Sequence, residues 1–64
     1  MSGALPEEER RRLRHDLRSP LTIIAGFAEV LASDRPISDA VRRDYAARIQ
    51  AAAEELSVLL DERL

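Results

Sequence analysis

The chain has 64 residues, a formal net charge of −2, one histidine and no cysteine. These values exclude disulfides and thiolate metal sites, and one histidine cannot build a zinc site alone. A chain this short buries little apolar surface as a monomer, so we expect a single domain over residues 1–64 that gains burial from a partner subunit.

The first predicted element is a helix near Glu7–Ser33. Residues 1–5 are expected to fray ahead of it, Pro6 suits a first helical position, and the acidic residues 7–9 favour the helix dipole. Apolar residues then recur every three or four positions, as in a helix that packs one face in a core. This stripe consists of Leu13, Leu17, Leu21, Ile24, Ala28 and Leu31, with a flank of Ile23, Phe27 and Val30.

A loop near residues 34–38 leads to a second predicted helix, near Asp39–Arg63. Pro36 disfavours helix at Arg35, and Ser38 is a good N-cap. Its apolar stripe consists of Val41, Tyr45, Ile49, Ala52, Leu56 and Leu59, with a flank of Val58 and Leu60. The predicted fold is therefore all-α, an antiparallel helical hairpin. Because one hairpin would leave both flanks exposed, we expect it to homodimerise into a four-helix bundle.

No apolar stretch reaches the length of a membrane span, and the N-terminus has no signal-peptide core. We therefore expect a cytoplasmic segment without membrane contact, whether or not a longer parent protein is membrane-anchored. The basic run Arg10–Arg12 raises the alternative of nucleic-acid binding. Glu7 and Glu8 stand four residues before two of these arginines, which favours helix ion pairs, and no aromatic residues interleave. We expect no nucleic-acid partner.

His15 falls on the face of the first helix opposite the apolar stripe, toward solvent. Small residues at Ser19 and Gly26 share this face, so a partner protein could approach the imidazole. A neutral imidazole has one nucleophilic nitrogen, and it attacks a phosphoryl group best when a neighbouring acceptor holds its N–H. Asp16 is the adjacent carboxylate, and Arg18 is a candidate to pair with phosphoryl oxygens.

Pro20 is an unusual residue inside a predicted helix. It removes one backbone hydrogen bond and crowds the carbonyl of Asp16, at a cost of about 3 kcal/mol in a plain helix. We therefore predict a kink just after His15, which would let the two halves of a bundle bend independently.

The segment His15–Leu21, HDLRSPL, resembles the H-box of sensor histidine kinases of two-component signalling, usually H-[E/D]-x-R-[T/N/S]-P-L. The second helix is also similar, at Arg43-Asp44-Tyr45, Ile49, Glu55-Leu56 and Leu59-Leu60-Asp61. The resemblance covers about Arg10 to Leu64. It implies the dimerisation and phosphoacceptor domain of these kinases, the HisKA-type domain, in which two helical hairpins form a homodimer.

The resemblance also implies roles for individual residues. His15 would take the γ-phosphoryl group of ATP and pass it to an aspartate on the receiver domain of a response regulator, with Asp16 as acid/base partner. Ser19 stands where many members carry Thr or Asn, which orient water for phosphatase activity, and the shorter Ser is a departure. Pro20 would mark the bend associated with switching between kinase and phosphatase states.

The family's ATP-binding domain carries an Asn box and Gly-rich boxes, whereas this chain has two glycines and no phosphate cradle. We therefore expect no cofactor or metal on this chain, and ATP with Mg on a separate kinase domain, in cis or in trans. Both a fragment of a larger kinase and a stand-alone phosphotransfer module fit the sequence. The alternative function is a non-catalytic helical-hairpin dimer that acts as a protein-interaction adaptor, which the stripes alone support equally well.

Overall fold

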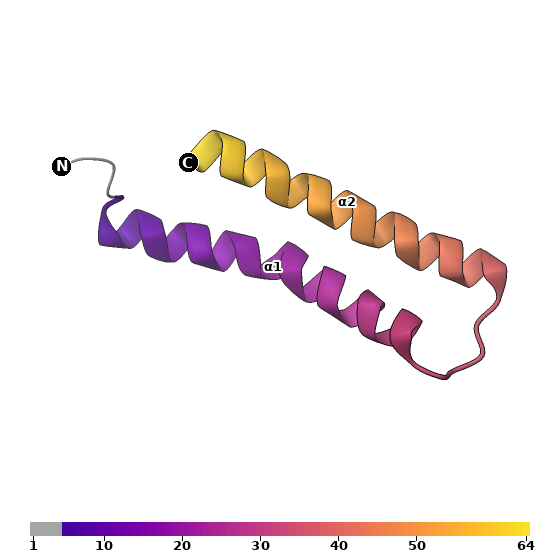
Figure 1. Ribbon diagram of the computed structural model, residues 1–64. Coiled ribbons are helices and arrows are strands. Elements are labelled where there is room, and N and C mark those ends of the chain that lie inside the picture. The colour runs from indigo at the N-terminus through magenta and orange to yellow at the C-terminus, as the bar shows by residue number, and fades with distance from the viewer. Residues whose placement is uncertain (1–4) are drawn as a thin grey trace.

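The computed structural model describes residues 5–64, which form two helices packed against each other (Figure 1). Helix α1 spans Glu7–Ala32 and helix α2 spans Asp39–Arg63. They run antiparallel, so the beginning of α1 lies beside the end of α2 (Figure 1). The predicted all-α helical hairpin is therefore confirmed. Residues 1–4, most of the expected frayed lead, lie outside the described residues.

Local chemistry explains where the two helices begin and end. Pro6 is the N-cap of α1, one residue before the first helical position expected for it, and its carbonyl accepts the first intrahelical hydrogen bond, from the N–H of Arg10. At the other end of α1, the backbone N–H and the hydroxyl of Ser33 both donate to the carbonyl of Val30, at 3.1 and 2.7 Å. The hydroxyl of Ser38 accepts from the N–H of Val41 at 3.1 Å, which confirms the predicted N-cap of α2.

The line of contact between the helices, here called the seam, consists of buried and half-buried residues. Their spacing alternates between four and three in both helices, as in coiled-coil packing. The seam residues are Leu13, Leu17, Pro20, Ile24, Phe27 and Leu31 on α1, and Tyr45, Ile49, Ala52, Leu56, Leu59 and Arg63 on α2. Three of them are buried, and the others are half-buried.

The predicted stripe of α1 was wrong at two positions, because Leu21 and Ala28 are exposed in the hairpin. Pro20 and Phe27 occupy the corresponding seam positions. The Phe27 ring packs against the Tyr45 ring with centroids 4.7 Å apart and a tilt of 47°, a contact that the Ala28 methyl cannot offer. The 3.6-residue pattern of apolar residues marks a side of α1 that is wider than the seam. Which part of that side is buried depends on how α2 packs against it.

A second set of apolar side chains remains uncovered in the single hairpin. The exposed large apolar residues are Leu21, Ile23, Val41, Val58, Leu60 and Leu64. Val41 was expected in the stripe of α2 and is instead exposed near the beginning of that helix. Across residues 5–64, neither helix is long and apolar enough to cross a membrane.

Candidate functional site

His15 lies in the first half of α1, and its side chain is 86% exposed. The prediction that the imidazole points to solvent is confirmed. The seam residues Leu13 and Pro20 are buried on the other side of the helix, so the packing of the hairpin leaves the imidazole within reach of an approaching molecule.

The carboxylate of Asp16 lies directly beside the imidazole. Its Oδ1 is 3.6 Å from Nδ1 of His15, which is longer than a hydrogen bond but close enough to form one with a small side-chain rotation. A proton on Nδ1 would then face the carboxylate, and the lone pair of Nε2 would face solvent. This arrangement orients the imidazole for nucleophilic attack by Nε2.

The other oxygen of the same carboxylate is held by a residue that the sequence interpretation missed. Arg63, in the last turn of α2, donates from its Nη1 to Oδ2 of Asp16 at 2.9 Å. Within residues 5–64 it is the one side-chain hydrogen bond that joins the two helices. A signal was available in the sequence, because Arg63 follows Leu56 and Leu59 at seam spacing. Its partner could not be identified without the register of the hairpin.

The ion pair with Arg63 also affects the acidity of the Asp16 carboxyl. The hydrogen-bonded guanidinium of Arg63 holds the pKa of the Asp16 carboxyl below its usual value, although partial burial acts in the opposite direction. The nearby imidazole of His15 adds a smaller lowering effect. The ion pair thus further favours the ionised carboxylate, which can accept a hydrogen bond from Nδ1–H of His15.

Arg18 and Ser19 both lie on the exposed side of α1. Their positions leave them accessible to a partner, and their predicted roles in binding phosphoryl oxygens and in phosphatase chemistry stay predictions. Two further cations lie near the imidazole. Arg11 and Arg12 line a shallow hollow together with Glu8 and His15.

Pro20 lies inside the continuous helix α1, five residues after His15. It is the largest fully buried side chain, a packing role that the sequence interpretation did not assign to it. Its missing N–H leaves the carbonyl of Asp16 without the usual helical donor. The hydroxyl of Thr22 donates to the carbonyl of Arg18 at 2.9 Å, a back-bond that often accompanies helix bending. The predicted kink and its switching role stay predictions.

Among residues 5–64, no group of three or more His, Cys, Asp or Glu side chains is arranged to hold a metal ion.

Comparison with known proteins places this geometry in a family. The family model for the His Kinase A (phospho-acceptor) domain matches residues 8–64, which includes the whole of the site and both helices apart from one residue. No curated protein and no solved structure matched the chain. The chain belongs to the His Kinase A (phospho-acceptor) domain family of the histidine kinases of two-component signalling.

Proposed function

We propose that His15 is the phosphoacceptor of this domain and that Nε2 is the atom that takes the phosphoryl group. One observation carries the proposal: the imidazole is 86% exposed and has a carboxylate oxygen 3.6 Å from Nδ1. In the transfer, the Nε2 lone pair forms a bond to phosphorus while the bond from phosphorus to the leaving oxygen breaks. Asp16 accepts a hydrogen bond from Nδ1–H and stabilises the positive charge that develops on the ring.

The phosphoryl donor in this proposal is ATP with Mg bound to a separate kinase domain, in cis or in trans, and ADP is the leaving group. The acceptor in the second step is an aspartate on the receiver domain of a response regulator. Both the kinase domain and the receiver domain would approach His15 from the exposed side of α1. Small residues on that side, such as Ser19 and Gly26, leave room for a partner protein. No side chain crosses the space above Gly26, where an added Cβ would meet nothing within 4 Å.

We test the first step with phosphoramidate, a small phosphodonor that needs no partner protein. Attack by Nε2 releases ammonia and leaves an acid-labile phosphoryl group on the histidine. We expect the wild-type chain to gain one phosphoryl group by intact mass, and His15→Gln to gain none while it stays helical by circular dichroism. A wild-type chain that stays unmodified, or His15→Gln that is modified equally, overturns the assignment.

The second step is tested with the phosphorylated chain and an isolated receiver domain. The expected result is loss of phosphoryl from the chain and its appearance on the receiver, and a receiver with its acceptor Asp changed to Asn serves as the control. A set of receivers from the same organism that all fail to accelerate loss from His15 would support the adaptor function instead.

The proposed functional unit is a homodimer, as is typical of this family. The single hairpin buries only three of its described residues and leaves several large apolar side chains exposed. At about 100° per residue, Leu21 of α1 and Leu60 of α2 lie on the same side of the seam, whereas Ile23 lies on the other side. A second copy that packs on the side of Leu21 completes a four-helix bundle and leaves His15 uncovered.

Two matched variants test this arrangement by sedimentation at micromolar concentration. Leu21 is 51% exposed and Ile23 is 40% exposed, so each change to Glu adds the same charge at a similarly accessible apolar position. We expect Leu21→Glu to sediment as a monomer and Ile23→Glu to remain a dimer. A monomeric wild-type chain with full helicity, or dissociation by Ile23→Glu alone, contradicts the arrangement.

A further inference from the structure

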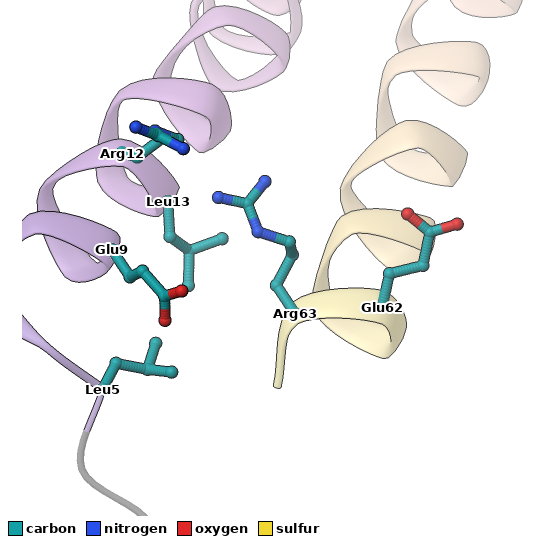
Figure 2. Close-up of a pocket in the computed structure, with 6 residues that line it drawn as sticks. All are labelled: Leu5, Glu9, Arg12, Leu13, Glu62 and Arg63. Carbon is teal, nitrogen blue, oxygen red and sulfur yellow. The ribbon is translucent and has the colours of Figure 1, made fainter.

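The two oxygens of the Asp16 carboxylate face two different side chains. Oδ1 of Asp16 lies 3.6 Å from Nδ1 of His15, and Oδ2 accepts a hydrogen bond from Nη1 of Arg63 at 2.9 Å. The three side chains therefore form a chain of contacts that runs from the exposed surface of α1 to the seam. Arg63 is about 30% exposed, and Figure 2 shows its side chain extending from the last turn of α2 into the space between the two helices.

Asp side chains on a helix surface rotate freely about their last bond, so an unrestrained carboxylate faces the neighbouring imidazole only part of the time. The contact with Arg63 removes this freedom by holding one oxygen. The other oxygen is then fixed on the side of His15. Outer partners of this kind commonly orient the group that contacts the reacting atom.

We propose that Arg63 is a positioning residue for phosphorylation of His15, which it influences only through the orientation and charge of the Asp16 carboxylate. This inference rests on the proposed role of His15. It assigns a function to the last turn of α2, because Arg63, which holds the Asp16 carboxylate, lies in that turn. The end of α2 and the phosphoacceptor site are thus linked by one ion pair.

The other groups near this ion pair are also charged. Glu9 and Arg12 from α1, and Glu62 from α2, line the hollow beside Arg63 (Figure 2). Within residues 5–64, Arg63 forms its ion pair with Asp16 and forms none with Glu9 or Glu62.

The first experiment measures the contact itself, independently of any reaction. NMR titration of the Asp16 carboxyl in the full chain should show its pKa rising toward the usual value in Arg63→Gln. Arg42→Gln is the matched control, since it removes one guanidinium from a 3.0 Å ion pair with Asp39 at the opposite end of the hairpin. An Asp16 titration that is unchanged by Arg63→Gln overturns the proposal.

The second experiment measures the rate of modification by phosphoramidate. We expect Arg63→Gln to react on the order of tenfold more slowly than wild type. General acid–base groups accelerate reactions by roughly 100- to 10,000-fold, and a residue that only orients such a group should account for a part of that acceleration. Arg42→Gln should react at the wild-type rate. Arg63→Lys should recover most of the loss, because the observed contact uses a single donor nitrogen. Circular dichroism at the assay temperature verifies that each variant is folded.

The decisive comparison adds Arg63→Gln to Asp16→Asn. If Arg63 acts through Asp16, the double variant reacts at the rate of Asp16→Asn alone. An equal further loss in the double variant, or a wild-type rate in Arg63→Gln, refutes the positioning role while leaving His15 as the phosphoacceptor. A wild-type chain that does not react refutes the phosphoacceptor proposal itself, so the two failures are distinguishable.

Discussion

Replacing Pro20 by Ala should stabilise the hairpin, although Pro20 is fully buried. An interior proline costs a helix about 3 kcal/mol relative to alanine. Against this, the change removes two buried carbons at about 0.8 kcal/mol each, which is about 1.6 kcal/mol, and the small gap left behind costs a further fraction. The free energy of unfolding should therefore rise by about 1 kcal/mol.

The assay is urea unfolding followed by circular dichroism at one fixed protein concentration, because unfolding of a dimer depends on concentration. With a slope of about 2 kcal/mol per molar, the midpoint should move up by about 0.5 M. Ser19→Ala, one residue away and exposed, is the control and should change stability by no more than a few tenths of a kcal/mol. A lower midpoint for Pro20→Ala would show that packing of the ring outweighs the strain it imposes on α1.

Three further changes test other parts of the hairpin by the same unfolding assay. Leu13→Ala should cost about 2–5 kcal/mol, since Leu13 is only 6% exposed, and a cost well under 1 kcal/mol would contradict its place in the core. Ser38→Ala should cost about 1 kcal/mol through loss of the N-cap of α2, whereas Ser57→Ala, exposed within that helix, should cost nothing. Because Asp16 has a lowered pKa in the folded state, its ionised form stabilises the fold above the unfolded-state pKa, and this contribution is lost as pH falls through the folded-state value. The stability advantage of wild type over Asp16→Asn should therefore shrink below about pH 4, and an advantage independent of pH would refute this reasoning.

The elements of this fold depend on short-range rules, and these are the parts that the sequence predicts well. Ser38 begins α2 because its hydroxyl can accept from an N–H three residues later, and no distant residue is needed. The solvent exposure of His15 likewise follows from its angle to the apolar residues of its own helix. Both predictions are confirmed because each depends on one helix alone.

The residues of the seam and the ion pair between Asp16 and Arg63 depend on how the two helices pack against each other. The sequence pattern of one helix does not give this packing. Leu21 was expected in the core and Pro20 only as a kink, yet the rotation of α1 toward α2 buries Pro20 and exposes Leu21. The partner of Arg63 lies 47 residues away in the chain, so it is defined only by the register of the hairpin. These features required the tertiary structure.

The position of Asp16 explains how one carboxylate can lie beside an exposed imidazole and also bind an arginine in the seam. His15 points nearly opposite the seam, and each following residue turns by about 100°, so Asp16 lies between His15 and the seam. From there its two oxygens reach the imidazole on one side and Arg63 on the other. A carboxylate before the histidine, at position 14, would turn toward the opposite flank, where Leu21 is exposed. Placing the acid directly after the histidine thus lets the same helix expose the proposed phosphoacceptor, contact α2 and keep the flank of the proposed dimer contact free.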